Sequence, residues 1–543
     1  MSENKREILK SAGLITTLSL LSRVFGYVRD QRVAFLLGTT PVADAFTLAY
    51  RIPNLLRRLV AEGSMTAAFI PVFSKYLTEK DQDEVWDFAN RMFWTLSLIL
   101  ASLAVLGVIF SPLLVRMFTL DPALFPSFVV QTFHMSPSKL PMDETVLLNR
   151  LMFPYIFFIG MSALAMGILN SYRIFGVPAF TPVVLNLSII ALSFCSRWFG
   201  HPSYALAVGV VIGGLLQIAI QVPLLWKQGM HFKLGISFSH PGIRRVGKLM
   251  LPGIIGIGVP YINFTVDTVF LTRPIMPDGS LLSLSVADRV MELVLGGYAI
   301  AVGTAILPMM SRHAAEKNIA ELKNTLAYSL RIVSFITIPA MVGLILMRRP
   351  IIQVLFQHGK FNAASTELTA WALMFYSIGL PWFALSKVLV PAFYSTHDTR
   401  TPVKVAFGIM FANIVMNLMF LKLLLNGGPP LATSLAGVLN SVILYQIFET
   451  RYGDIGWRHV REALGRIMVA SCGMGVAVWL LLRVVSFSTK HALWYRAGLL
   501  TLVLAFATSI YFGLCWLMHC EELSDIYGIA RRKRAVGPDI AVE

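Results

Sequence analysis

Long apolar segments repeated along almost the whole chain constrain the fold more than any other feature of the sequence. A helix needs roughly 20 apolar residues to cross the hydrocarbon core of a bilayer, and on that criterion we count about fourteen segments. Almost nothing is left between them for a soluble domain. The segments lie near residues 11–37, 42–76, 86–115, 147–171, 179–199, 203–226, 246–272, 281–310, 322–347, 365–392, 402–425, 430–449, 463–485 and 495–518.

The composition supports this interpretation. Hydrophobic residues make up 56% of the chain and charged residues 14%, and the mean hydropathy is +0.69. Soluble domains have about 25% charged residues. We therefore predict an all-α polytopic membrane protein. Its first segment follows MSENKREILK, lacks a small-residue cleavage site and is interrupted by charge, which indicates a retained helix and not a signal peptide.

The net charge of +17 could suggest a nucleic-acid partner, but the basic residues are distributed over short loops and are not gathered with aromatic residues in one domain. The positive-inside rule explains them if both termini are cytoplasmic. Only the loop with Arg348, Arg349 and Lys360 breaks this pattern. The predicted cytoplasmic segments contain Lys5, Arg6, Lys10, Lys227, Lys233, Arg244, Arg245, Lys248, Arg451, Arg458, Arg461 and the run Arg531 to Arg534.

The chain contains a weak internal repeat. VADAFTLAYRIPNLL, from Val42, resembles VADRVMELVLGG, from Val286, and both stretches lead to a Pro-x-x-Ser sequence. Farther along, SPLLVRMF matches RPIIQVLFQ, and FTPVVLN matches RTPVKVA, in the same order. Each unit would hold six helices and start from the same side, as in parallel transporter repeats that bind substrate at their interface.

This repeat predicts a domain organisation of two six-helix lobes around a central cationic cavity, followed by two further helices. The boundaries are 1–226 for the first lobe, 227–245 for a cytoplasmic connecting loop, 246–450 for the second lobe, 451–518 for the last two helices, and 519–543 for a basic cytoplasmic tail.

Charged residues inside the predicted helices indicate where the chain functions. SRVFGYVRDQR, from Ser22, places three arginines and an aspartate within the first apolar segment. Such residues are costly in a membrane, so they either form ion pairs between helices or line a wet cavity. Because the excess is cationic, and because the guanidinium group suits phosphate, we expect an anionic cargo. The candidate residues are Arg23, Arg29, Asp30, Asp44, Arg51, Asn54, Arg57, Arg58, Glu62, Asp288, Arg289 and Lys387.

Glycines in two of these helices are candidate hinges. Gly63 follows Glu62 in VAEGSM, and the corresponding VLGGYA supplies Gly296 and Gly297. Glycine in a helix costs about 0.8–1.0 kcal/mol relative to alanine, yet it permits bending and close approach. We expect either tight packing or a gate in which Glu62 pairs with an arginine in one state only.

Four stretches together resemble one family. They are SRVFGYVRD, ADAFTLAYRIPNLLRRLVAEGSMTAAFIPVF, ADRVMEL followed by GTAILP, and KVLVPAFYSTHDTRTPVKVA. They are similar to the MurJ (MviN) lipid II flippase family of the multidrug/oligosaccharidyl-lipid/polysaccharide exporter superfamily. The resemblance implies fourteen helices, a V-shaped central cavity, and movement of undecaprenyl-pyrophosphate-linked peptidoglycan precursor to the periplasmic leaflet of a bacterial inner membrane by alternating access.

The resemblance also implies roles for particular residues and a transporter, not an enzyme. It further implies that the last two helices form a groove for the lipid tail. Some family members are thought to use a sodium site, although ordinary interhelical hydrogen bonds would explain the same residues; the membrane potential is the other possible driving force. The family's important residues match Arg23, Arg29, Arg57, Arg289, Asp44, Glu62 and Lys387, and the candidate sodium ligands are Asp267, Asn413, Asn417 and Thr433.

Three other functions compete with this hypothesis. A flippase for another polyprenyl-linked glycan would share the pyrophosphate, whereas a drug or cation antiporter of the superfamily predicts an acidic cavity. A membrane enzyme acting on polyprenyl phosphate would need an acidic metal motif or a nucleophile with its base. The sequence contains no such motif, and histidines such as His134, His313 and His358 lack ligand spacing.

Overall fold

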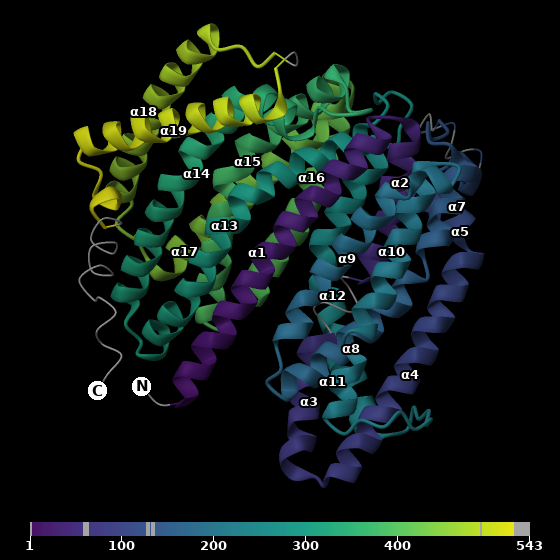
Figure 1. Ribbon diagram of the computed structural model, residues 1–543. Coiled ribbons are helices and arrows are strands. Elements are labelled where there is room, and N and C mark those ends of the chain that lie inside the picture. The colour runs from purple at the N-terminus through teal and green to yellow at the C-terminus, as the bar shows by residue number, and fades with distance from the viewer. Residues whose placement is uncertain are drawn as a thin grey trace. The chain divides into compact units, whose positions relative to one another are not determined.

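The computed structural model describes residues 3–57, 65–125, 127, 131, 136–488 and 491–525. For residues 3–12, 66–67, 251–264 and 297–305 it describes the backbone only. These residues form helices and no strand. The chain divides into two compact units, each of which is described by itself (Figure 1). Unit 1 comprises Met1–Leu282 and His358–Asn362, and unit 2 comprises Ser283–Gln357 and Ala363–Glu543.

Unit 1 contains the helices up to α12 and the first residues of α13. Two short 3₁₀ turns, Pro122–Leu124 and Ser196–Trp198, lie between its helices. The helices are α1 (Glu3–Leu37), α2 (Pro41–Arg57), α3 (Thr66–Glu79), α4 (Gln82–Ile109), α5 (Ser111–Thr119), α7 (Met142–Met152), α8 (Tyr155–Ser171), α9 (Gly176–Phe194), α10 (Pro202–Ala219), α11 (Val222–Lys227) and α12 (Pro241–Leu271).

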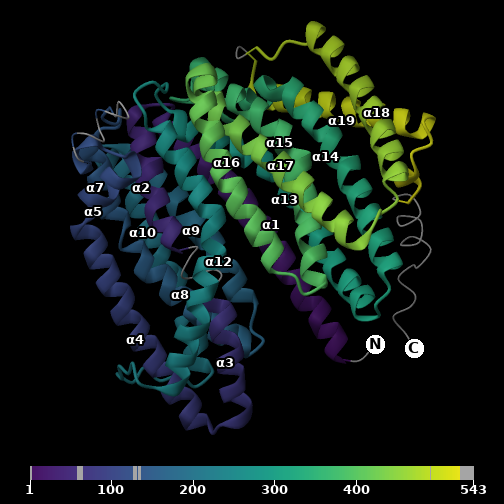
Figure 2. The ribbon, with the colours of Figure 1, turned by 180° about the vertical axis from the view of Figure 1, so that it is seen from behind.

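Unit 2 contains longer helices, and several of them have proline inside (Figure 2). A 3₁₀ turn, Leu425–Gly427, joins two of them. The helices are α13 (Ser280–Ala315), α14 (Ile319–Phe356), α15 (Ala363–Ser395), α16 (Arg400–Leu424), α17 (Gly428–Tyr452), α18 (Trp457–Val484) and α19 (Leu493–Leu517).

The described part of the chain contains nine helical stretches that are long and apolar enough to span a membrane. This confirms a polytopic all-α membrane protein, while the number fourteen stays a prediction. Helices α1, α2, α12 and α13, in which many of the candidate charged residues lie, are not among the nine. The nine are Gln82–Ile109, Met142–Ser171, Gly176–Phe194, Pro202–Lys227, Ile319–Phe356, Ala363–Ser395, Arg400–Tyr452, Trp457–Val484 and Leu493–Leu517.

Close packing of α9 against α10 holds one side of unit 1. A Cβ atom at Gly209 would lie 3.0 Å from the Cα atom of Ile189, and one at Gly213 would lie 2.7 Å from a methyl carbon of Leu185. The Ser188 hydroxyl donates to the Gly209 carbonyl at 2.9 Å. Small residues allow helix backbones to approach in this way in membranes. Helix α1 packs along α9, so this rigid pair fixes the course of α1.

An aromatic core fills the other side of unit 1. Phe69 and Phe73 of α3 stack at 5.1 Å between ring centroids, and both lie near Phe88 of α4. Met161 and Leu164 of α8 belong to the same buried cluster. The core therefore joins α3, α4 and α8, and α12 packs against α3 beside it.

In unit 2, α15 packs between α14 and α17 (Figure 2). Phe393 of α15 and Phe448 of α17 meet edge to face at 5.8 Å between centroids. The last two helices, α18 and α19, pack against each other and against α14. The Tyr511 hydroxyl of α19 donates to the Phe335 carbonyl of α14 at 2.6 Å, which attaches the C-terminal helices to this unit.

The boundary between the compact units lies elsewhere than the predicted boundary between lobes. The units divide after Leu282, whereas the repeat places the connection at 227–245. Helix α12, assigned by the repeat to the second lobe, packs against α3, α4 and α5. The two boundaries need not coincide, because the compact units reflect which helices pack together, whereas the repeat reflects similarity within the sequence. The repeat and its domain boundaries therefore stay predictions.

A charged corner fixes the start of α16 in unit 2. The carboxylate of Asp398 accepts hydrogen bonds from the backbone N–H groups of Arg400 and Thr401, at 3.1 and 2.9 Å. The Thr401 hydroxyl, at 2.6 Å, and the guanidinium of Arg451 donate to its other oxygen. The bonds from Thr401 and the charge of Arg451 lower the pKa of Asp398 well below its ordinary value.

We predict that Asp398→Asn lowers the thermal stability of the purified protein, because the amide loses the charge that these donors stabilise. Loss of a helix-start acceptor costs about 1 kcal/mol. A group whose pKa is depressed by folding stabilises the fold above its unfolded pKa, about 3.9, and loses that effect as pH falls toward the folded pKa. Melting curves should therefore differ at neutral pH and converge in acid. Glu462→Gln, in the exposed pair with Arg458, is the control; an equal loss in both variants would contradict the prediction.

Candidate functional site

Arg29 of α1 lies at the centre of a cluster of candidate site residues in unit 1. Its Nε and Nη2 atoms donate to Asp30 Oδ1 at 2.9 and 2.6 Å. Its Nη1 atom donates to Oδ1 of Asn186, on α9, at 3.1 Å. The Arg29 and Asp30 side chains are 15% and 19% exposed. The adjacent carboxylate thus neutralises a guanidinium that the surrounding helices shield from solvent.

Asn186 connects this cluster to the α1 backbone. Its Nδ2 atom donates to the Ser22 carbonyl at 3.1 Å while its Oδ1 atom accepts from Arg29. Gly26 lies one turn after Ser22, and a Cβ atom there would lie 3.6 Å from Nδ2, an ordinary contact distance, so the amide lies directly beside this turn of α1. One side chain on α9 therefore fixes both the α1 backbone and the direction of the Arg29 side chain.

An aromatic ring from α2 completes the cluster. The guanidinium carbon of Arg29 lies 6.0 Å from the ring centroid of Tyr50. A cation at that distance from an aromatic ring is weakly attracted to it. Arg29 and Asp30 were predicted from the sequence as site residues, whereas Asn186 and Tyr50 were not. The signal for Asn186 was present in FTPVVLN, which the repeat had marked without assigning a role to its asparagine.

Asp44 has a different environment from the one expected for a cavity residue. It is fully buried on α2 and accepts from the backbone N–H groups of Gly279, Leu281 and Leu282 at 2.9, 2.8 and 3.1 Å. The Lys139 ammonium lies 3.4 Å from its Oδ2 atom. Asp44 therefore caps the start of α13 within unit 1, which is the position where a helix favours a negative charge.

The remaining candidates on α2 form local or cross-helix hydrogen bonds. Arg51 is 8% exposed, and its Nη1 atom donates to the Thr268 hydroxyl of α12 at 2.6 Å. Arg57 donates through Nε to Asn54 Oδ1 at 2.8 Å. Arg58, Glu62 and Gly63 lie outside the described residues, so the gate predicted around Glu62 stays a prediction.

In unit 2, the candidate charges follow α13 and α15. Arg289 forms an ion pair with Glu292 at 3.0 Å, one turn farther along α13, and Asp288 beside it is half-buried. Lys387 of α15 is exposed within this unit, and Arg23 of α1 in unit 1 is half-buried. Helix α13 runs without a break through Gly296 and Gly297.

Three of the four candidate sodium ligands lie together in unit 2. Asn413 Nδ2 lies 3.5 Å from the Thr433 hydroxyl, and Asn417 Nδ2 donates to Asn413 Oδ1 at 3.0 Å. Asp267, buried on α12, belongs to unit 1. The oxygens of the group suit a hard cation, while its amides already bond to one another. Among the described residues, no group of three or more His, Cys, Asp or Glu side chains is arranged for a metal ion.

The two best-described charged groups, Asp44 and Arg29, differ in how the surrounding structure holds them. Asp44 accepts hydrogen bonds from three backbone N–H groups at the start of α13 and lies near Lys139. These partners belong to the packed helices. Arg29 is held by its neighbouring carboxylate and one amide, so an incoming anion could replace Asp30 at the guanidinium without displacing a helix. Such an arrangement can bind and release a phosphate group, and neither cluster supplies a nucleophile with a general base.

The sequence of the chain matches the family described as "Lipid II flippase MurJ" over residues 33–498. The chain belongs to the MurJ lipid II flippase family. Its relatives include the probable lipid II flippase MurJ of Vibrio cholerae, 35% identical over 81% of this chain and 83% of the relative. The lipid II flippase MurJ of Burkholderia cenocepacia is 32% identical over 93% of this chain and 96% of that protein.

Solved structures agree with this family membership. The fold is similar to that of a lipid II flippase MurJ in an inward closed conformation, with a TM-score of 0.74, 25% identity, and 93% of this chain and 98% of that chain covered. An inward-facing multidrug MATE transporter of the MOP superfamily, at 12% identity and a TM-score of 0.59, shares the fold alone; 81% of this chain and 98% of that chain are covered. Members of the MurJ family are membrane transporters and not enzymes.

We predict that Asn186→Ala reduces transport severalfold while the protein still accumulates in the membrane, because Arg29 loses the acceptor that directs it. Ser193→Ala is the matched control: it removes the bond at 3.1 Å from Arg32 Nε, also between α1 and α9. Flipping rates measured in reconstituted vesicles compare the two variants. Equal rates in both would mean that Asn186 only joins the helices.

Proposed function

We propose that this protein moves lipid II, the undecaprenyl-pyrophosphate-linked peptidoglycan precursor, from the cytoplasmic to the periplasmic leaflet of the bacterial inner membrane by alternating access. The observation that carries the proposal is the shielded Arg29 cluster in a chain of the MurJ family. The proposed substrate has an anionic pyrophosphate, which is the group that arginine binds best.

The chemistry of Arg29 explains how substrate could be bound and then released. In the described state the guanidinium donates to Asp30 Oδ1 through two nitrogen atoms. A pyrophosphate oxygen would compete for the same N–H groups, while Asn186 keeps the third donor directed. Because Asp30 remains adjacent in the chain, it can reclaim the guanidinium once the phosphate departs, so that no bare charge is left in an apolar environment.

The same proposal includes the orientation of the chain. The basic connections place both termini in the cytoplasm by the positive-inside rule. A drug or cation antiporter is not favoured, because the chain belongs to the MurJ family and its Arg29 cluster offers a cation to the cargo. A flippase for a different polyprenyl-linked glycan would use the same phosphate chemistry, so substrate identity depends on transport experiments.

The driving force in this proposal is a sodium ion or the membrane potential. Asn413, Asn417 and Thr433 of unit 2 supply neutral oxygen atoms, and Asp267 of unit 1 is the charged candidate that the sequence supplies. A hard monovalent cation suits that set, whereas a carrier driven by potential alone needs no such cluster.

We predict that Arg29→Glu abolishes lipid II transport and leaves membrane insertion intact. The variant removes the phosphate-binding cation and places a second carboxylate beside Asp30. Arg289→Glu places a second carboxylate beside Asp288 and should abolish transport in the same way. Complementation of a strain depleted of its own flippase is the measurement. Arg173→Glu, an exposed arginine after α8, has the same charge change and should complement; full complementation by Arg29→Glu would remove the cluster from the mechanism.

We also predict that Asp267→Asn weakens coupling to sodium without weakening substrate binding. Transport is measured in vesicles with and without sodium at a fixed membrane potential, and lipid II binding is measured in parallel. The wild type should slow in sodium-free buffer, and the variant should lose this response. A wild-type rate independent of sodium would leave the membrane potential as the driving force.

A further inference from the structure

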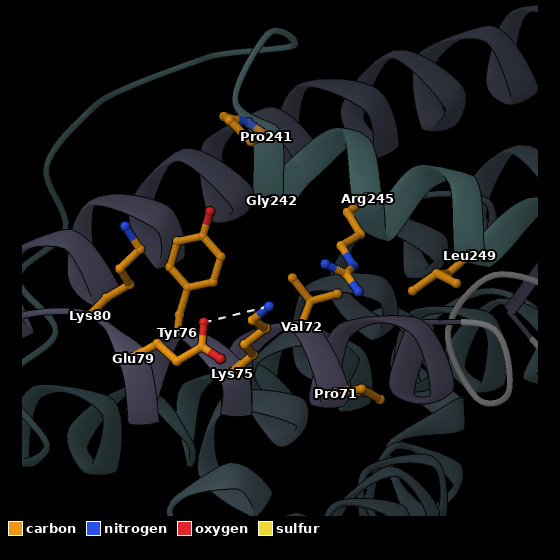
Figure 3. Close-up of a pocket in the computed structure, with 10 residues that line it drawn as sticks. All are labelled: Pro71, Val72, Lys75, Tyr76, Glu79, Lys80, Pro241, Gly242, Arg245 and Leu249. Atoms are coloured by element: carbon orange, nitrogen blue, oxygen red, sulfur yellow. Dashed lines mark ion pairs between the residues drawn. The ribbon is translucent and has the colours of Figure 1, made fainter.

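A pocket of unit 1, separate from the Arg29 cluster, lies between the end of α3 and the start of α12 (Figure 3). Its volume is 290 Å³, close to the lower limit of about 300 Å³ for small-molecule sites. None of its lining residues belongs to the proposed lipid II site. They are Pro71, Val72, Lys75, Tyr76, Glu79, Lys80, Pro241, Gly242, Arg245 and Leu249.

One wall of the pocket is the ring of Tyr76, which packs on further aromatic rings behind it. Tyr76 and Phe88 stack at 4.5 Å between ring centroids, and the ring of His240 stacks on Phe88 at 5.3 Å. A Cβ atom at Gly242 would lie 2.7 Å from a carbon of the Phe88 ring and 3.0 Å from the Tyr76 hydroxyl oxygen. The first turn of α12 therefore rests directly on these rings, which fixes its distance from α3.

Cations predominate among the charged residues of the pocket. Three lining residues, Lys75, Lys80 and Arg245, are basic, and Glu79 is acidic. Lys75 pairs with Glu79 at 3.5 Å, and both side chains are about half exposed. Within the described residues, Arg245 forms no ion pair. In Figure 3, Arg245 and Lys75 extend from facing helices toward the same space.

The pocket also lies at the boundary between apolar and polar sequence. On α3 the apolar stretch that contains Val72 ends at Lys75, and on α12 the apolar stretch begins immediately after Lys248. Pro71 and Leu249 of the pocket are exposed within unit 1. Basic residues beside apolar apposed helices occur where a membrane protein meets the headgroups of anionic lipids.

We propose that this pocket binds the phosphate group of an anionic membrane lipid. Arg245 and Lys75 contact the phosphate oxygens, while Lys80 at the rim pairs with Glu84 at 3.0 Å. Val72 and Leu249 contact the start of the acyl chains. The site holds α3 against α12 through a lipid, and it is distinct from the proposed lipid II cluster because it shares no residue with it.

The test measures retention of phosphatidylglycerol relative to phosphatidylcholine by the purified full-length protein, using native mass spectrometry from mixed micelles. Lys75→Gln/Arg245→Gln should bind phosphatidylglycerol about thirtyfold more weakly, as expected for the loss of two basic residues at an anionic headgroup. Arg244→Gln/Lys248→Gln is the matched control, because it removes equal charge from exposed positions of α12 outside the pocket. Its effect should be less than about twofold, consistent with charges that are screened by solvent.

Two additional arms make the outcome decisive. Arg245→Lys, which keeps the charge, should retain binding, and Arg245→Gln alone serves if the double variant does not fold. Equal losses in the pocket and control variants would overturn the proposal in favour of a general basic surface. A second arm adds inorganic phosphate at fixed ionic strength. Stabilisation by phosphate that requires Lys75 and Arg245, without retention of phosphatidylglycerol, would assign the pocket to soluble phosphate and overturn the lipid.

Discussion

A charge that is removed from water must find a partner, and this constraint explains how unit 1 is joined. Arg29 joins α1 to α9 through Asn186, and Arg51 joins α2 to α12 through the hydroxyl of Thr268. Asp44 joins α2 to the first turn of α13. A hydrogen bond to a charged group contributes about 1.5–3 kcal/mol, and removing the neutral partner leaves the buried charge without compensation. The charged residues of a membrane transporter therefore also determine which helices pack together.

A charged residue with many hydrogen-bond partners within the protein has a structural role, whereas one with few partners is free to bind a cargo. Asp44 accepts from three backbone groups and lies near Lys139, so no competing ligand could match its environment. Arg29 depends on a carboxylate from the next residue and one amide. An anion can therefore take the place of the carboxylate at small structural cost. Arg29 is the candidate for the phosphate, because it is a cation that an anion can reach by replacing Asp30, whereas the Asp44 carboxylate would repel a phosphate.

Charged residues also lie at the ends of helices, and they differ in how many partners they have within the protein. In unit 2, Arg331 of α14 pairs with Glu521 at 2.8 Å and with Glu522 at 3.4 Å, just beyond α19. His459 of α18 lies 3.1 Å from Glu521. This cluster attaches the last two helices to α14 at one end. In unit 1, Lys75 and Lys80 of the pocket between α3 and α12 pair with Glu79 and Glu84, whereas Arg245 forms no ion pair with the described residues. The contrast is consistent with an external anion at that position.

Much of the fold could be predicted from the sequence, because hydrophobic length and charge distribution act locally along the chain. The apolar segments predicted a helical membrane protein, and the motifs around RIPNLLRRLVAEG predicted the family. Helix 281–310 was placed within a few residues of α13, which spans Ser280–Ala315. Arg29 and Asp30 were selected because ionisable residues in an apolar helix stand out against their neighbours. Such signals need no knowledge of distant contacts.

Only the tertiary structure decided what each of these charges contacts. Asn186 is 157 positions from Arg29, and Gly279 is 235 positions from Asp44, so neither pairing produces a local pattern. A neutral asparagine in an apolar helix also gives a weaker signal than a charge. The pocket that Lys75 and Arg245 line gave no local signal either, because basic residues at the ends of two separate apolar segments satisfy the positive-inside rule whether or not their side chains meet. Sequence determined which residues are costly in a membrane, and packing determined which partner compensates each of them, because that partner is chosen by spatial proximity.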